Sequence, residues 1–204
     1  MPAAARQHPH RRRRRGRRGG RHDRLTAQTH RGKGKHAMSG KSRKIAVCGL
    51  LGALALALTL LEGMLPPIPG LPPGARPGLS NIVTMFAAGS LGLPYALAIA
   101  LIKGVFAFLT RGVTAGLMSL SGGLMSTLAM WVVWKKTRFS LLFTGVCGAL
   151  AHNAAQLCIA VFLTGRAALF YIPAMLLLSI VCGLCTGLVL RLLLPLLEKL
   201  HLTG

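Results

Sequence analysis

The sequence predicts an all-α integral membrane protein with six transmembrane helices in one bundle. Three observations support this fold class. Hydrophobic residues make up 52% of the 204 residues and charged residues only 14%, which is too apolar for a soluble domain of this length. The apolar residues form runs as long as a membrane-spanning helix needs. Beyond residue 40, most basic residues cluster at the ends of these runs.

The first 40 residues are rich in Arg and Gly and differ in kind from the rest of the chain. Thirteen of the 25 Lys and Arg residues precede Met38. So few apolar side chains cannot bury enough surface to fold, and we expect residues 1–40 to be a disordered basic head. No aromatic residues separate its arginines, so nucleic acid is not the expected partner, whereas membrane lipid is. The alternative is that the natural start is Met38 and that the preceding residues are translated upstream sequence.

The first predicted span, residues 45–65, follows a basic cluster at residues 41–44. Gly49, Ala53 and Ala57 recur at every fourth position within it, which places three small side chains along one stripe of a helix. Such a stripe lets another helix approach closely. The alternative is that Gly and Ala are simply common in membrane helices.

The segment at residues 61–84 interrupts the apolar pattern and is where we expect a binding site. It holds Glu62, the only carboxylate between positions 41 and 191, and then six prolines, Arg76 and Asn81. An acid at the end of a membrane helix, followed by a rigid turn and a polar residue that re-enters the membrane, would form a lid over a pocket. The alternative is that Glu62 lies at the water interface and that the prolines only stiffen a loop.

Five further spans are predicted after this loop. The first two are short, and Gly-Leu-Pro separates them, with Pro94 suited to the first turn of a helix. Lys103 lies inside the second, where a charge must pair, face water or reach the interface. Two tryptophans and a basic cluster end the third, as expected at a cytoplasmic boundary. The five spans are residues 79–91, 95–110, 115–134, 139–163 and 167–194.

The basic residues predict that both termini face the cytoplasm. From Met38 on, this orientation places eight Lys and Arg residues on the cytoplasmic side and three outside, as the positive-inside rule requires. A pocket that opens outward is the simplest interpretation of the polar residues. Those expected in or above the outer half of the membrane are Glu62, Arg76, Asn81, Lys103, Arg111, Ser119 and Ser121.

A second polar group lies within residues 139–163. His152 and Gln156 are four residues apart and therefore share one helical face, with Asn153 at its flank. Such side chains are costly near mid-membrane unless they are satisfied, and they normally face the bundle interior. They are expected either to bond neighbouring helices, at about 1 kcal/mol per bond, or to share in ligand binding.

The sequence offers little for catalysis. Its only acids are Asp23, Glu62 and Glu198, so it lacks the carboxylate cluster that holds Mg²⁺ in phosphoryl or isoprenoid chemistry. Cys182 and Cys185 have the spacing of a redox or zinc pair, but no other metal-ligand pattern accompanies them. We therefore expect no enzyme activity, no metal and no cofactor. Transport against a gradient would need energy from another polypeptide.

Four short stretches resemble a known family. They are LEGMLPPIPG from Leu61, PGLSNIVT from Pro77, SGGLMSTLAM from Ser121 and GALAHNAAQL from Gly148. These stretches resemble the Gx transporter family, whose members are also named heptaprenyl diphosphate synthase component I. The resemblance covers nearly all of residues 41–197 and no part of the basic head.

The resemblance implies that residues 41–204 form a six-helix membrane domain similar to the S component of an energy-coupling-factor (ECF) transporter. In that class, the first helix docks through small residues onto a transmembrane coupling protein, which two cytoplasmic ATPases drive. Gly49, Ala53 and Ala57 fit this role. The substrates of the class are vitamins and other micronutrients captured from outside the cell.

The function implied is therefore substrate binding for uptake of a small organic micronutrient, by a multi-pass protein of a bacterial plasma membrane. The alternative is a non-catalytic membrane subunit that assists a heptaprenyl or polyprenyl diphosphate synthase. The candidate substrate-binding residues are Glu62, Arg76, Asn81, Lys103, Ser121, His152, Asn153 and Gln156.

Overall fold

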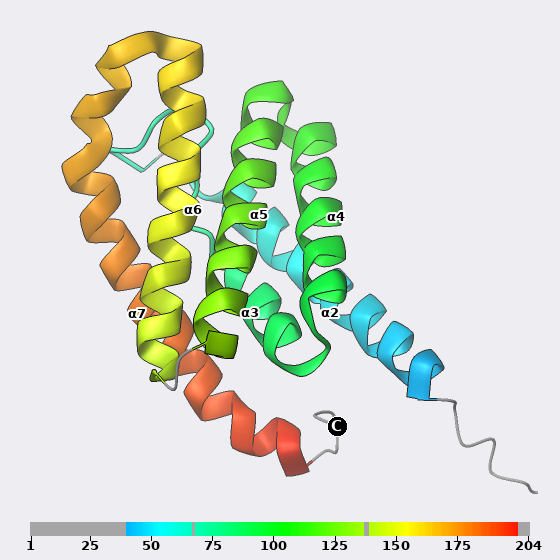
Figure 1. The fold of residues 1–204 in the computed structure, drawn as a ribbon. Coiled ribbons are helices and arrows are strands. Elements are labelled where there is room, and N and C mark those ends of the chain that lie inside the picture. The colour runs from blue at the N-terminus through cyan, green and yellow to red at the C-terminus, as the bar shows by residue number, and fades with distance from the viewer. Residues whose placement is uncertain (1–39, 67, 137–138, 200–204) are drawn as a thin grey trace, which may run out of the picture. The chain divides into compact units, whose positions relative to one another are not determined.

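The computed structural model describes residues 40–66, 68–136 and 139–199, and the predicted basic head lies outside them. All regular structure in these residues is helical, which confirms the all-α class. The helices are shown in chain order in Figure 1. They are α2 (Gly40–Met64), α3 (Asn81–Ser90), α4 (Leu93–Arg111), α5 (Val113–Lys136), α6 (Leu141–Thr164), the 3₁₀ helix η1 (Gly165–Tyr171) and α7 (Ile172–Lys199).

Four stretches of the described chain are long and apolar enough to cross a membrane. The fourth includes both α6 and α7. Helix α3 has ten residues and is about 15 Å long, half of the ~30 Å hydrocarbon core of a bilayer. It does not cross a membrane alone, so a count of six crossings stays a prediction. The four stretches are Lys41–Met64, Leu93–Arg111, Val113–Lys136 and Leu141–Pro195.

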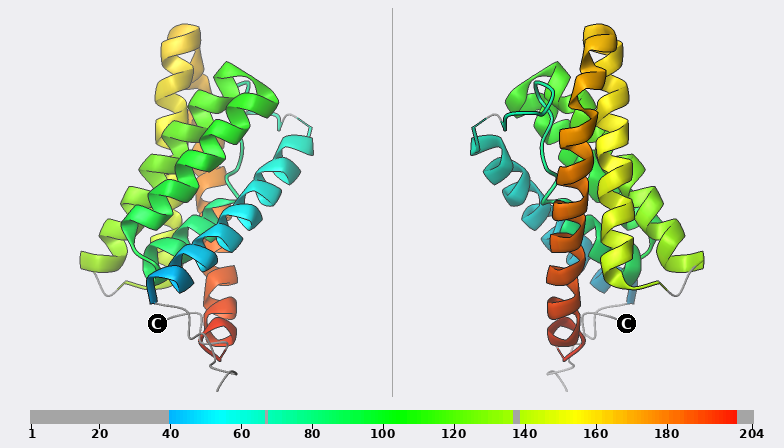
Figure 2. Two further views of the ribbon diagram at one scale, coloured as in Figure 1. Left: turned by 90° about the vertical axis from the view of Figure 1, so that its right-hand side faces the viewer. Right: turned by 90° about the vertical axis from the view of Figure 1, so that its left-hand side faces the viewer.

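Helices α4 to α7 pack in sequence, each against the next, and glycine allows two of these pairs to approach closely. A Cβ added at Gly187 of α7 would lie 2.5 Å from the Cα of Leu142 on α6. A Cβ added at Gly104 of α4 would lie 2.9 Å from the Cα of Leu120 on α5. Helices α6 and α7 accordingly lie side by side in both views of Figure 2.

Helix α3 lies inside the bundle and contacts α2, α4, α5, α6 and α7. Seven of its ten residues are buried. It ends at Ser90, and Gly92, whose φ of 98° favours glycine, separates it from α4, where Pro94 occupies the first turn. This break gives α3 its length and leaves its first residue, Asn81, in the interior.

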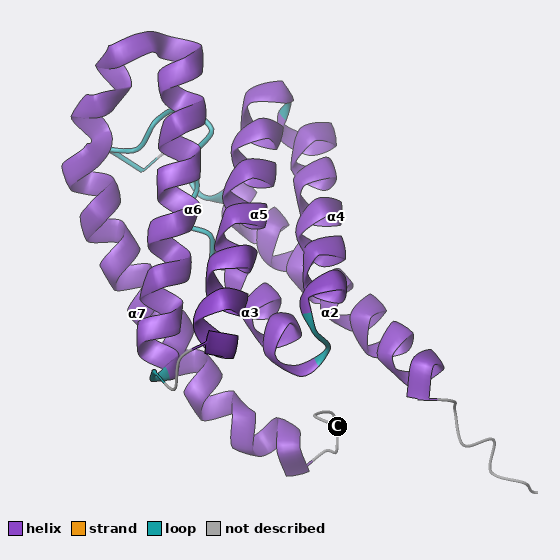
Figure 3. Ribbon diagram, viewed as in Figure 1, coloured by secondary structure: helices purple, strands orange, loops and turns teal. Residues whose placement is uncertain are grey.

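The segment between α2 and α3, residues 65–80, which we call the proline loop, packs against the bundle (Figure 3). Its Ala75 is buried in a cluster with Met118 of α5 and Ala160 of α6. A Cβ added at Gly70 would lie 2.9 Å from the Cβ of Ala174 on α7. The loop therefore contacts three helices, and its prolines do more than stiffen a solvent-exposed turn.

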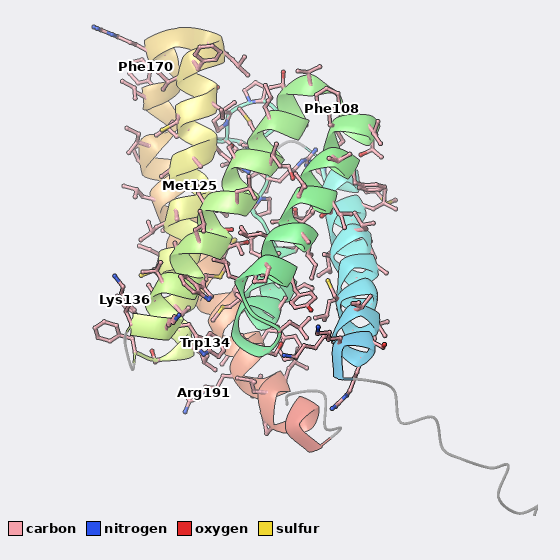
Figure 4. The ribbon with its side chains drawn as sticks, turned by 45° about the vertical axis from the view of Figure 1, so that its right-hand side comes forward. Phe108, Met125, Trp134, Lys136, Phe170 and Arg191 are labelled. Carbon is pink, nitrogen blue, oxygen red and sulfur yellow. The ribbon has the colours of Figure 1, made fainter. Side chains whose placement is uncertain are left out.

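The residues labelled in Figure 4 lie toward the two ends of the bundle. Trp134, Lys136 and Arg191 lie toward one end, and Phe108 and Phe170 lie toward the other. The start of α2 and the end of α7 lie at the basic end (Figure 1). This arrangement agrees with the charge asymmetry read from the sequence, while the orientation of the bundle in a membrane stays a prediction.

Candidate functional site

A small polar cavity lies where the end of α2, the proline loop, α4, α5 and α6 meet. Its volume is about 10 Å³, which is room for about one water molecule. The structure thus brings together five of the eight predicted site residues in a closed pocket. The lining residues are Glu62, Gly74, Arg76, Gly78, Ser80, Lys103, Arg111, Ser119, His152 and Gln156.

Glu62 joins the last turn of α2 to the start of α3. Its side chain is buried, with 3% of its surface exposed, and Oε1 accepts a hydrogen bond from the backbone N–H of Ser80 at 2.9 Å. Ser80 immediately precedes α3. The first N–H groups of a helix carry partial positive charge, so this position favours a carboxylate.

Lys103 approaches the same point from α4. Its side chain is 1% exposed, and Nζ donates a hydrogen bond to Oδ1 of Asn81 at 2.8 Å. Glu62 and Lys103 line one cavity, yet each bonds to the start of α3 rather than to the other. Asn81, a predicted site residue, does not line the cavity and is linked to it through its hydrogen bond with Lys103.

Two guanidinium groups line this cavity, one from the proline loop and one from the end of α4. Arg76 donates from Nη1 to the carbonyl oxygen of Leu65 at 2.7 Å, which links the two ends of the proline loop. Its Nε is buried and has no partner among the described residues, and the same holds for Nε and Nη1 of Arg111. Arg111 also lies against the end of α2, because a Cβ added at Gly63 would be 3.3 Å from its Cδ.

His152 and Gln156 close the cavity from α6. Nε2 of His152 and Nε2 of Gln156 lie 2.8 Å apart, and both side chains are buried. The imidazole is held between two glycines. A Cβ added at Gly122 of α5 would lie 2.7 Å from Nδ1, and one added at Gly78 of the proline loop would lie 3.1 Å from Nε2. The absence of side chains at these glycines lets the loop and α5 close on the ring.

Besides Asn81, two other predicted residues lie outside this cavity. Nδ2 of Asn153 donates to Oγ of Ser179 at 2.7 Å and to the carbonyl oxygen of Met175 at 3.2 Å. These bonds tie α6 to α7, and Asn153 lines a separate apolar cavity of about 210 Å³ there. Ser121 donates from Oγ to the carbonyl oxygen of Met118 in its own helix.

Arg111 and Ser119 line the cavity although the sequence did not mark them as candidates for binding. Both were expected in the outer half of the membrane. The sequence feature that could have identified Arg111 is its position directly before a glycine at the end of an apolar run. In the structure Arg111 is the last residue of α4, and Gly112 follows with a φ of 88°. A turn this tight holds the guanidinium beside the neighbouring helix ends.

The small-residue stripe lies on the outer face of α2. Gly49, Ala53 and Ala57 are exposed, and a Cβ added at Gly49 would meet no other atom within 4 Å. The stripe borders a groove of about 490 Å³ between α2 and α4, which Tyr95 also lines. Ala55 is buried and packs in the core instead.

The sequence of the chain matches the model of a protein family described as heptaprenyl diphosphate synthase component I, over residues 51–193. The chain belongs to this family. The match confirms the resemblance to the Gx transporter family, and the matched range includes every residue that lines the polar cavity. No curated protein sequence matches the chain.

The fold also matches a solved structure described as the S component of a bacterial ECF transporter. The two chains are 18% identical, and the match covers 79% of this chain and 98% of the other, with a TM-score of 0.62. At this identity the likeness shows a shared fold. The Gx family protein therefore has the fold of an ECF S component.

Proposed function

We propose that this protein is the substrate-binding membrane component of an ECF-like transporter that takes up a small organic micronutrient. The observation that supports this most strongly is the closed polar cavity under the proline loop, within a fold shared with an S component. Its ligands would be Glu62, Arg76, Lys103, His152 and Gln156, with Asn81 positioning Lys103. Asn153 and Ser121 do not line this cavity, so we do not propose that they contact the ligand.

The proline loop acts as the lid of this site. Gly74, Arg76 and Gly78 of the loop line the cavity, and the volume of about 10 Å³ holds no organic molecule. A ligand enters only when the loop moves away from α5 and α6. The hydrogen bond from Arg76 to Leu65 stiffens the loop internally, so it moves largely as one piece.

The stripe on α2 serves as the docking surface for the coupling protein. Exposed small residues beside a groove allow a partner helix to approach the backbone of α2 closely. The ATPases would bind the coupling protein in turn and supply the energy. Because the basic ends of α2, α5 and α7 lie together, we place both termini in the cytoplasm and the lid on the outer side of a bacterial plasma membrane.

The description of the family favours a second candidate, a non-catalytic membrane subunit of a polyprenyl diphosphate synthase. The chain itself has three acidic residues, Asp23, Glu62 and Glu198, and among the described residues no group of His, Cys, Asp and Glu could hold a metal ion. A catalytic role in that reaction is therefore not proposed.

Co-purification from native membranes in mild detergent tests the proposed function. The wild-type protein should bring down a transmembrane coupling protein and ATPases. Ala53→Trp should lose both, because the bulky side chain blocks close helix approach. Leu177→Trp is the matched control, since Leu177 is 67% exposed on α7, away from the stripe, and it should keep them. Capture of a soluble prenyltransferase in place of the ATPases would contradict the proposal and favour the second candidate.

A further inference from the structure

We infer that the polar cavity recognises an anion, a carboxylate or a phosphate group on a small organic molecule whose apolar body lies under the proline loop. The inference rests on the proposed function only in taking this cavity as the binding site. It adds the chemical class of the ligand, which neither the family match nor the structural match gives.

The charges of the lining residues are unbalanced. Arg76, Lys103 and Arg111 contribute three cations and Glu62 contributes one carboxylate. The carboxylate is already bonded to the N–H of Ser80 at the start of α3, whose partial positive charge it offsets. Cations enclosed in a poorly solvated site repel one another and are costly without a counter-charge. An anionic ligand would supply that counter-charge.

The unused hydrogen-bond donors also match an anion. More than about 90% of buried polar groups in proteins have a partner, but Nε of Arg76 and both Nε and Nη1 of Arg111 have none among the described residues. A guanidinium presents its N–H donors in one plane, which suits the oxygens of a carboxylate or phosphate. Arg111 thus presents two unused donors, Nε and Nη1, beside the cavity.

The described partners of Lys103 and His152 are neutral groups. Nζ of Lys103 bonds to the neutral amide oxygen of Asn81 and not to the Glu62 carboxylate. The side chain of Gln156 bonds to His152 on the same helix. A cationic ligand would meet three like charges here, and a neutral ligand would leave the charge excess in place.

A second cavity accounts for the apolar body of the ligand. It has a volume of about 310 Å³ and is lined by the proline loop, including Ile68, Leu71 and Pro72. Gly74 and Arg76 line both this cavity and the polar one. The two cavities adjoin at Gly74 and Arg76, so a molecule whose anionic head enters the polar cavity when the loop opens would place its apolar body against the loop.

The test uses the detergent-purified full-length protein and four probes that share one butyl chain. The probes are pentanoate, butyl phosphate, butan-1-ol and butylamine, and the rise in unfolding temperature with probe concentration gives each Kd. At least one anion should bind about tenfold or more tightly than the alcohol, as expected for hydrogen bonds to a charged group. The stronger of the two anions identifies a carboxylate or a phosphate ligand.

Variants connect the result to the cavity. Arg111→Gln should raise the Kd of the preferred anion about tenfold without lowering the unfolding temperature of the ligand-free protein, because it removes an unpaired cation. Arg111→Lys keeps the charge but lacks the planar N–H donors of the guanidinium. Its Kd for the preferred anion should lie between those of Arg111→Gln and the wild type. Arg166→Gln is the control, since Arg166 is exposed in η1 and lines neither cavity, and it should leave the Kd unchanged.

Equal binding of the four probes, tighter binding of butylamine, or no binding of either anion would overturn the inference. So would native mass spectrometry that finds a retained neutral or cationic molecule. These outcomes concern ligand class alone. A protein that prefers anions but captures no ATPases would keep this inference and lose the proposed transport function.

Discussion

Glu62, Lys103 and Asn81 meet at the first residues of α3, and this meeting organises the site. The carboxylate reaches the start of α3 from α2 and the ammonium reaches it from α4. Each is almost fully buried, so each depends on the hydrogen bond that it makes at the start of α3. The start of α3 therefore holds two oppositely charged side chains in place without an ion pair between them.

The two possible roles of Glu62 can be separated by substitution. Glu62→Ala leaves the buried N–H of Ser80 without its acceptor, and we expect a loss of about 1–3 kcal/mol in stability. Glu62→Gln keeps an acceptor oxygen at the same place and should lose less. Unfolding temperatures of the ligand-free variants in detergent measure both. Equal losses for the two variants would show that the charge, rather than the hydrogen bond to α3, is what matters.

The sequence identified polar residues within the predicted spans but not which of them touch. Span order and charge predict that Glu62, Arg76 and Lys103 lie in one half of the membrane. Which of them touch depends on helix rotation, which an apolar sequence leaves almost undetermined. Asn153 is the clearest example, since one residue after His152 turns a helix by about 100° and directs this side chain to α7.

At the scale of elements, the proline loop and α3 differ most from the sequence prediction. The pattern predicted a second span at residues 79–91, and the structure has the ten-residue α3. Apolar composition predicts burial but does not distinguish burial in lipid from burial among other helices. The contacts of α3 with five other helices bury its apolar residues, and its part in crossing the membrane stays a prediction.

Closure of the proline loop depends on a glycine beside the site. Gly78→Ala introduces a Cβ 2.7 Å from Nδ2 of Asn81 and 3.1 Å from Nε2 of His152. It also places a side chain at φ 78°, which costs about 1–2 kcal/mol. We expect both a lower unfolding temperature and weaker binding of the preferred anionic probe, because the loop no longer seats on His152.

Gly165→Ala is the matched control for this prediction. Its φ is 76°, so the backbone cost is similar, but its Cβ would meet nothing within 4 Å. It should lower stability without changing probe affinity beyond that backbone effect. If the two variants weaken binding equally, the loop at Gly78 is not part of the lid.

At the scale of the whole molecule, the features separate onto different faces and ends. The polar cavity lies inside the bundle under the proline loop, the small-residue stripe lies on the outer face of α2, and Lys136 and Arg191 lie at the end that includes the start of α2. Such a separation suits a protein that captures a solute on one side and docks a partner through its flank. The all-α class and the small-residue stripe could be predicted, because long apolar runs and small residues at every fourth position can be read from the sequence itself.

Uptake into proteoliposomes tests the central claim most directly. The vesicles contain the protein together with the coupling protein and ATPases that co-purify with it, and the molecule retained by the purified protein is labelled and added outside. The molecule should accumulate inside only when ATP is supplied to the ATPases, and vesicles made with Ala53→Trp should accumulate none. Accumulation that is independent of ATP, or a bound molecule that ATP hydrolysis never moves across the membrane, would contradict the assignment as a substrate-binding transport component.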